Sequence, residues 1–362
     1  RILGNLNLIN AVQQAEFYLS SNLEEFSLDY FKLKNLLPNL LENNLPKELI
    51  KLGEFSISGY TKITPSAIEA ALKVNSEIGS IVSDLELNNF KSMDEAIYKG
   101  EVVLDRFDLG DFFEDSSFGS VSFEGEVDGL GFRAGNRNTK LVGEIYEIKF
   151  NEYNYKNISI NGLYKNNLFN GKLASNDDNL KGTFEGLADL SEVINKFDFK
   201  ATINYANLRA LNLFKRDSIS ELKGLIDLDL KGNKLENIVG IANFKNVNFG
   251  DGSVTFQFSR FDDGNIFFDK VTFNGKSVDF SKVDFGSGKL DFRRADFGDA
   301  DVSFEEMEHG NERINFRRAK FGTGAISFKM ALFGDADVIF DETEFGSGNL
   351  SLLKAEARKI SF

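Results

Sequence analysis

The 362-residue sequence lacks several residue types, and each absence excludes a kind of chemistry. It contains no cysteine, which excludes a disulfide framework, thiolate catalysis and cysteine-ligated metals. Its single histidine, His309, argues against a histidine-based metal or acid–base site. No segment approaches the roughly 18 consecutive apolar residues of a membrane-spanning helix. Basic residues are outnumbered, 42 against 56 acidic, and the formal charge of −14 disfavours broad nucleic-acid binding.

Tryptophan is also absent, but phenylalanine is abundant, with 37 residues. From Val247 onward the phenylalanines recur in a frame with a period of twelve, as in "ADFGDADVSF" from Ala295 to Phe304. One column of the frame contains Phe249, Phe261, Phe273, Phe285, Phe297, His309, Phe321, Phe333 and Phe345. The other column contains Phe256, Phe268, Phe280, Phe292, Phe304, Phe316, Phe328, Phe340 and Leu352.

Short strands are predicted at each repeat, because a smaller apolar residue stands two positions before most of these phenylalanines. Val302 precedes Phe304 in this way, and the polar Ser303 lies between them. Local alternation inside a fixed repeat is typical of short strands stacked into a solenoid, with the alternating apolar residues pointing inward. The spacing between successive phenylalanines alternates between five and seven. Two arrangements fit this pattern: a four-sided coil made of two repeat periods and a two-sided coil made of one.

The shorter step, as in "FRRADF" from Phe292 to Phe297, resembles the pentapeptide-repeat family over about residues 247–362. The resemblance implies a right-handed quadrilateral β-helix, used as a structural or protein-binding solenoid. Some members of that family are DNA mimics that inhibit a type II topoisomerase, which requires a uniformly acidic surface. Residues 247–362 carry 20 acidic and 15 basic residues in alternating blocks such as Arg293-Arg294 and Glu305-Glu306. DNA mimicry is therefore not expected, and His309 is expected to be an interior or corner residue.

Residues 1–246 lack this period but contain strand patterns. In "FDFKATINY" apolar residues from Phe197 to Tyr205 alternate with polar ones, which predicts long antiparallel strands with one apolar face. Leucines near residues 29–52 fall at helical spacing, interrupted by Pro38 and Pro46, and predict short helices that cap a sheet. The segment "TPSAIEAALKV" has helix-forming residues but lies between strand patterns, and we predict a strand there.

Ordered motifs such as "VVLDRFDLGDFF", "SVSFEGEVDGLGF" and "GNKLENIVGIANFKNVNF" resemble the TamB family, the translocation and assembly module subunit, over about residues 1–249. The resemblance implies a curled antiparallel sheet, or β-taco, whose apolar interior forms a trough. It also implies a periplasmic protein of the bacterial cell envelope, with the parent chain anchored in the inner membrane. The implied roles are outer-membrane protein assembly or translocation and phospholipid transport, with acyl chains and an outer-membrane assembly protein as partners.

The resulting prediction is an all-β chain with minor helix near the N-terminus, in two domains at 1–246 and 247–362. We expect a non-enzymatic protein, because no catalytic constellation, metal site or cofactor motif is visible. If the repeat half defines the protein, a cytoplasmic location is expected instead. The same alternation also fits a closed core rather than a trough. If the sheet is a trough, the residues expected to face lipid are Val121, Phe123, Val127, Phe197, Phe199, Ile203 and Tyr205.

Overall fold

The computed structural model describes residues 2–10, 16–36, 47–90, 92, 94–132, 135–189, 193–213, 221–232, 239–261 and 264–362. Its internal contacts divide the chain into two compact units, Arg1–Asp177 and Asp178–Phe362. The change from antiparallel to parallel strand pairing, where the repeat begins, lies inside the second unit.

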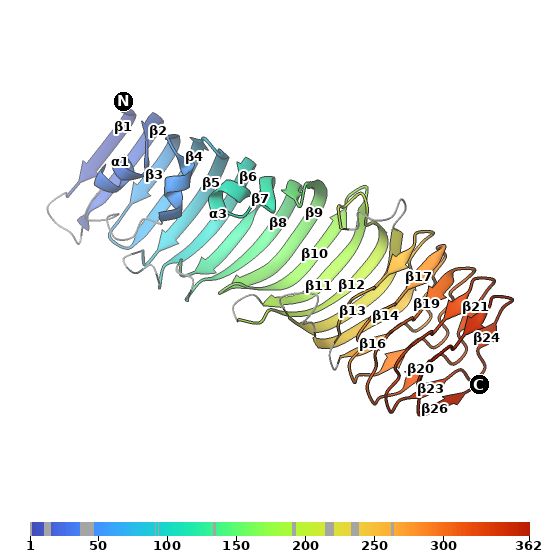
Figure 1. The fold of residues 1–362 in the computed structure, drawn as a ribbon. Helices are drawn as coiled ribbons and strands as arrows, with labels where there is room; N and C mark the ends of the chain where they lie inside the picture. The colour runs from blue at the N-terminus through green and yellow to red at the C-terminus, as the bar shows by residue number, and fades with distance from the viewer. Residues whose placement is uncertain are drawn as a thin grey trace. The chain divides into compact units, whose positions relative to one another are not determined.

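The first unit is an antiparallel sheet in which each strand pairs with the next one along the chain (Figure 1). The strands are β1 (Ile2–Ile9), β2 (Tyr18–Leu28), β3 (Phe55–Ile63), β4 (Ala67–Ser76), β5 (Gly79–Asn88), β6 (Ile97–Asp108), β7 (Phe118–Leu130), β8 (Asn138–Phe150), β9 (Tyr153–Lys165) and β10 (Leu168–Asn176). The predicted strand at "TPSAIEAALKV" is confirmed as β4. Its helix-forming residues adopt an extended conformation because β3 and β5 pair with both of its edges.

Short helices cover one end of this sheet. They are α1 (Tyr30–Leu36), the 3₁₀ helix η2 (Lys47–Leu52) and α3 (Leu109–Phe113). Asp108 caps α3, since its side chain accepts a hydrogen bond from the Asp111 amide. The prediction of short helices near 29–52 is confirmed by α1 and η2, whereas Pro38 and Pro46 lie outside the described residues.

The second unit begins with four antiparallel strands and then changes to parallel pairing. The antiparallel strands are β11 (Leu180–Asp189), β12 (Lys196–Asn207), β13 (Glu221–Lys231) and β14 (Val239–Asn248). β14 pairs antiparallel with β13 and parallel with β16 (Asn265–Phe267), so that Ala242 is in register with Ile266. β14 therefore belongs both to the sheet and to the first parallel ladder.

The repeat forms a solenoid whose strands pair in parallel with strands two repeat periods further on, as Val278 does with Val302. The remaining strands are β15 (Val254–Thr255), β17 (Ser277–Asp279), β18 (Leu290–Asp291), β19 (Asp301–Ser303), β20 (Ile314–Asn315), β21 (Lys320–Phe321), β22 (Ile326–Ser327), β23 (Asp337–Ile339), β24 (Glu344–Phe345), β25 (Leu350–Ser351) and β26 (Lys359–Ser361).

Four ladders run along the solenoid, which makes it four-sided. They pass through Val278 and Val302, through Leu290 and Ile314, through Asp296 and Lys320, and through Asp284 and Glu308. The ladder of β15, β17, β19, β22 and β25 has five strands, so the solenoid has about five coils. The two-sided coil made of one repeat period is excluded, because Val278 pairs with Val302 rather than with Leu290. The predicted fold class is confirmed: an all-β chain with an antiparallel sheet followed by a β-helix.

The phenylalanine columns form the core of the solenoid. Phe297 stacks on Phe321 with ring centroids 4.6 Å apart and ring planes 2° apart. Phe280, Phe304 and Phe328 stack in the same way at 5.0 and 4.8 Å. Phe304 is 0% exposed, whereas neighbouring outward positions such as Glu308 are exposed. The inward assignment made from the repeat is therefore confirmed along both columns.

Candidate functional site: the apolar sheet faces

The sheet of the first unit has one apolar face, which we call the apolar face of unit 1. Strand register aligns Val74, Ile81, Leu104, Phe123 and Ile145 in one row across β4 to β8. The next row contains smaller and mixed residues, including Leu72, Ser83, Val102, Gly125, Gly143 and Ile160. Side chains between these positions, such as Glu101 and Glu126, are exposed on the opposite face.

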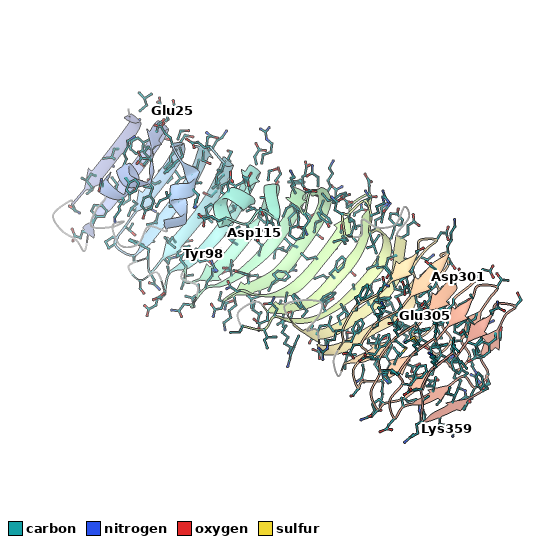
Figure 2. All side chains as sticks on the ribbon, in the orientation of Figure 1. Glu25, Tyr98, Asp115, Asp301, Glu305 and Lys359 are labelled. Atoms are coloured by element: carbon teal, nitrogen blue, oxygen red, sulfur yellow. The ribbon has the colours of Figure 1, made fainter. Side chains whose placement is uncertain are left out.

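One end of this face is a closed core. Leu28, Leu52, Phe55, Phe107, Val121 and Phe123 form a buried cluster against which Leu109 and Phe112 of α3 pack. Val121 and Phe123, two of the expected lipid-facing residues, therefore lie under the helix-covered end. Val127 lies further along β7, registered with Gly100 and Leu141, and is half-buried. In Figure 2, Asp115 marks the helix-covered end of the strands and Tyr98 marks the other end.

Glycines let aromatic rings lie flat on this face. Gly125 and Gly143 are opposite each other on β7 and β8, and a Cβ atom on either would lie 2.5 or 2.7 Å from the Phe123 ring. Gly162 is covered in the same way by Phe169, where the distance would be 2.5 Å. No larger residue fits beneath these rings. The aromatic rings thus form part of the floor of the apolar face.

The antiparallel sheet of the second unit has a similar face, the apolar face of unit 2. Phe197, Phe199 and Ala201 of β12 are registered with Leu230, Leu228 and Ile226 of β13. Gly186 of β11 lies beside Phe199, and a Cβ atom there would approach the Phe199 Cα to 2.5 Å. Phe197 and Phe199 are half-buried, while Ile203 is 7% exposed. The structure therefore brings three of the four candidates of β12 onto one face.

Tyr205 does not lie in that row. The register of β12 with β13 shifts between Ile203 and Ala206, so two residues of β12 occupy the place of one. This bulge returns Ala206 to the apolar face, where it is 1% exposed, and pairs Tyr205 with the exposed Lys181. The Tyr205 hydroxyl donates to Glu221 Oε1 over 3.4 Å. Simple alternation in the sequence could not reveal this shift.

The apolar face of unit 2 continues into the solenoid core. Ala242 is in register with Ile266, which in turn is in register with Leu290. Phe244 stacks on Phe268 at 5.1 Å with ring planes 6° apart. Along this direction Phe244 is half-buried, whereas Phe268 is 1% exposed. One continuous set of columns therefore changes from a half-exposed surface into a filled core.

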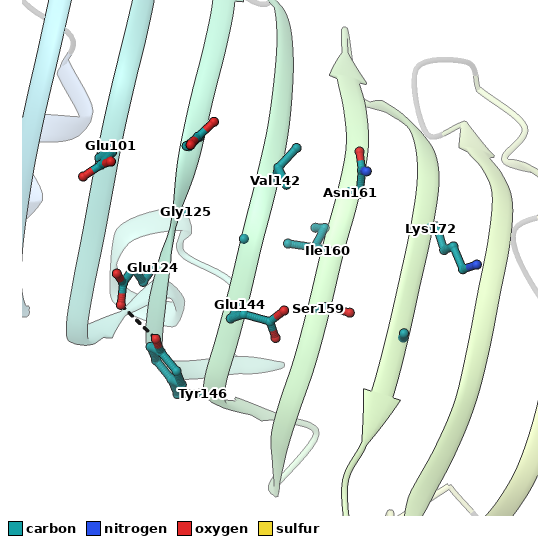
Figure 3. A pocket seen from close by; sticks show the side chains of 13 residues that line it. Glu101, Glu124, Gly125, Val142, Glu144, Tyr146, Ser159, Ile160, Asn161 and Lys172 are labelled. Atoms are coloured by element: carbon teal, nitrogen blue, oxygen red, sulfur yellow. Dashed lines mark hydrogen bonds between the residues drawn. The ribbon is translucent and has the colours of Figure 1, made fainter.

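The opposite face of the first sheet carries a shallow cavity of about 540 Å³, shown in Figure 3. Carboxylates of Glu101, Glu124 and Glu144 line it, together with Tyr146. The Tyr146 hydroxyl donates to Glu124 Oε2 over 2.8 Å, and this interaction raises the pKa of Tyr146. The lining offers carboxylates, a phenol and the amine of Lys172, and no cysteine or histidine is among its residues.

Two features of the described residues bear on other kinds of site. No group of three or more histidine, cysteine, aspartate or glutamate residues is placed to hold a metal ion within the described ranges. Of the helices that the structure describes, none is long and apolar enough to cross a membrane. His309, expected in the interior, is 6% exposed, and its Nε2–H donates to the Glu312 carbonyl over 2.7 Å. Comparison of the chain with family models, curated proteins and solved structures found no match.

Proposed function

We propose that the chain is a non-enzymatic segment of a cell-envelope protein that holds phospholipid acyl chains along its apolar sheet faces. The TamB-like motifs of residues 1–249 motivate the location in the periplasm and a role in outer-membrane protein assembly or in phospholipid transport. Within this proposal the solenoid is a rigid structural module that ends the apolar face of unit 2. These roles require no catalytic residues and no cofactor.

The observation that carries the proposal is the contrast in burial along one set of columns in the second unit. In the middle of the solenoid, inward rings are covered by rings from a neighbouring face, as Phe268 is by Phe280 at 5.7 Å. On the sheet, Phe197 and Phe199 are only half-buried, whereas Phe268 and Phe280 of the solenoid are almost fully buried. Half-exposed aromatic residues in aligned rows favour an apolar occupant, because each buried CH₂ group contributes about 0.8 kcal/mol.

The test places one charge on either face of β12. Phe199→Asp puts a carboxylate on the apolar face, and Thr202→Asp puts the same charge on the exposed opposite face. After incubation with phospholipid vesicles, the chain is repurified and bound lipid is counted by native mass spectrometry. We expect Phe199→Asp to retain several-fold less lipid than the parent, and Thr202→Asp to retain as much as the parent.

Two results would contradict the proposal. Absence of lipid from the parent chain would show that the faces do not hold acyl chains. Equal loss of lipid in both variants would show that charge or instability, rather than the apolar face, controls retention. Far-UV circular dichroism of both variants checks that the sheet remains folded.

A further inference from the structure

Unpaired buried polar atoms gather at one edge of the first unit. Among the described residues, the buried side-chain nitrogen and oxygen atoms without a hydrogen-bond partner are Arg137 Nε, Asn138 Oδ1, Asn166 Oδ1 and His309 Nδ1. The first three belong together, because Asn138 is in register with Lys165 and Asn166 follows Lys165 in the turn between β9 and β10. Buried polar atoms are almost always paired in folded proteins. Of the three atoms at this edge, only Arg137 Nε carries a donor, and an external anionic group would supply the acceptor that it lacks.

Arg137 is held in position with part of its hydrogen-bonding capacity unused. Its guanidinium carbon lies 4.9 Å from the centre of the Tyr164 ring, and Nη2 donates to the Tyr164 hydroxyl over 3.4 Å. That hydroxyl donates in turn to Asn167 Oδ1 over 3.0 Å. Stacking uses the face of the guanidinium, whereas Nε–H lies in its plane and has no acceptor. Within the described part of the chain, no carboxylate forms an ion pair with Arg137.

These features fit an oxyanion. A guanidinium presents its in-plane donors as a fork that matches a phosphate or carboxylate, and such charge-assisted bonds are the stronger hydrogen bonds of proteins. The amide group of Asn166, in the turn between β9 and β10, adds a donor on rotation about its last side-chain bond. Lys165 and Asn138 lie in register on the opposite face of the sheet, as do Lys140 and Asp128, so none of these four side chains faces the apolar rows that Arg137 borders.

The edge with Arg137 borders the apolar face of unit 1. Thr139 is in register with Tyr164, and the next inward position of β8, Leu141, is in register with Gly162 beneath the Phe169 ring. Tyr98, labelled in Figure 2, stacks on Phe132 at 4.6 Å, and its hydroxyl is hydrogen-bonded to that of Thr139. Tyr98 and Tyr164, which carry polar hydroxyl groups, thus lie between the apolar rows and Arg137. This order of groups matches an amphiphile, with tails on the rows and an anionic head at the edge.

We propose that Arg137, with Asn166, binds the phosphodiester of a phospholipid whose acyl chains lie on the apolar face of unit 1. The proposal rests on the proposed function, because it assumes that acyl chains occupy this face. It adds the chemical class of the head group and the residues that recognise it.

The experiment compares two lipids that share acyl chains and differ in the phosphate. Vesicles of phosphatidylglycerol and dispersions of the matching diacylglycerol are presented to the full chain, and bound lipid is measured by native mass spectrometry. Arg137→Gln removes the charge, Arg137→Lys keeps the charge without the planar fork, and Arg106→Gln is the control at an exposed arginine. Loss of one charge-assisted contact corresponds to about tenfold weaker binding or more.

We expect Arg137→Gln to bind phosphatidylglycerol about tenfold less and diacylglycerol as well as the parent, with Arg137→Lys intermediate. Arg106→Gln should match the parent for both lipids. Equal loss of both lipids in Arg137→Gln and Arg137→Lys would mean that Arg137 only supports the sheet, and no loss would also overturn the proposal. Binding of inorganic phosphate alone, with the same dependence on Arg137, would replace the lipid by a free anion. Failure of the parent to bind diacylglycerol and phosphatidylglycerol alike would count against the proposed function itself.

Discussion

Truncation of one ring in the middle of the solenoid tests how its stability arises. Phe304 is 0% exposed and contacts four rings: it stacks on Phe280 and Phe328 and meets Phe292 and Phe316 edge to face, both at 5.6 Å. Phe304→Ala leaves all four neighbours with a vacant side. Coils above and below hold the neighbours in register, so we expect little collapse into the space.

The magnitude follows from two contributions. Loss of the buried ring costs about 2–3 kcal/mol in transfer free energy. A residual cavity of roughly 100 Å³, at about 24 cal/mol per Å³, adds about 2 kcal/mol. The expected loss in free energy of unfolding is therefore about 4–5 kcal/mol, near the upper end of phenylalanine-to-alanine substitutions. Glu308→Ala, an exposed outward position of the same coil, is the control and should cost less than about 0.5 kcal/mol.

The assay must report on the solenoid alone, and tyrosine fluorescence cannot do so. The nine tyrosines of the chain all lie at or before Tyr205. Hydrogen exchange followed by mass spectrometry resolves peptides from the coils that contain Phe280 to Phe328. We expect their protection to fall sharply in Phe304→Ala and to remain unchanged in Glu308→Ala. Equal protection in both variants would refute the assignment of stability to the ring stack. Asp301 is also an exposed residue of this coil, but Asp301→Ala is unsuitable as a control, because the Asp301 carboxylate accepts a hydrogen bond from the Ala325 amide over 2.8 Å.

Further predictions concern single residues of both units. Burial lowers the pKa of His309, so folding disfavours the protonated ring. The contribution of the neutral His309 to the free energy of unfolding is therefore lost as pH falls through about 6.5, where the ring becomes protonated in the unfolded chain. His309→Phe should therefore gain stability relative to the parent between pH 7.5 and pH 5 in urea titrations, and a constant difference would contradict this. Gly143→Val brings a Cβ atom to 2.4 Å from the Glu124 carbonyl oxygen and should lower the free energy of unfolding, measured by thermal unfolding, by about 1–3 kcal/mol. Glu144→Val, on the exposed face, is the control and should not show this loss. Hydrogen bonds from Arg318 and Arg317 lower the pKa of Glu342 to about 2, so its carboxyl signal in NMR should titrate near that pH. The contribution of this carboxylate to the free energy of unfolding is present above about pH 4.3 and is lost as pH falls. Titration of the signal near pH 4.3 would disprove the pairing.

The solenoid could be predicted from the sequence almost residue by residue, because its contacts repeat at a fixed separation. Phe297 and Phe321 occupy equivalent positions of successive coils, so the period of the sequence already contains their pairing. The last coil departs from this rule. Val338 pairs with Ile360, and Phe340 stacks on Phe362, each two positions closer in sequence than the other pairs. A shortened corner of this kind leaves the inward pattern intact, and the pattern alone does not mark it.

The candidate site was less predictable, since it depends on contacts between distant residues. Alternation correctly placed Phe197 and Phe199 on one face, but a bulge moved Tyr205 out of it. Burial of Phe123 results from helices that precede β3 and follow β6, which no local pattern around β7 indicates. Arg137 became a candidate only because strand register brings it beside Tyr164. Its sequence neighbourhood, "GNRNTK", resembles an ordinary polar turn.

The dual pairing of β14 has a consequence for the order of folding. A solenoid coil gains most of its contacts from its neighbours, so the first coil of an isolated repeat has no partner on which to nucleate. β14 supplies that partner, since its edge pairs with β16 while its other edge is fixed by β13. Phe244 likewise presents a ring on which Phe268 stacks. We therefore expect the coils to assemble in the direction of synthesis, each completed coil serving as the template for the next.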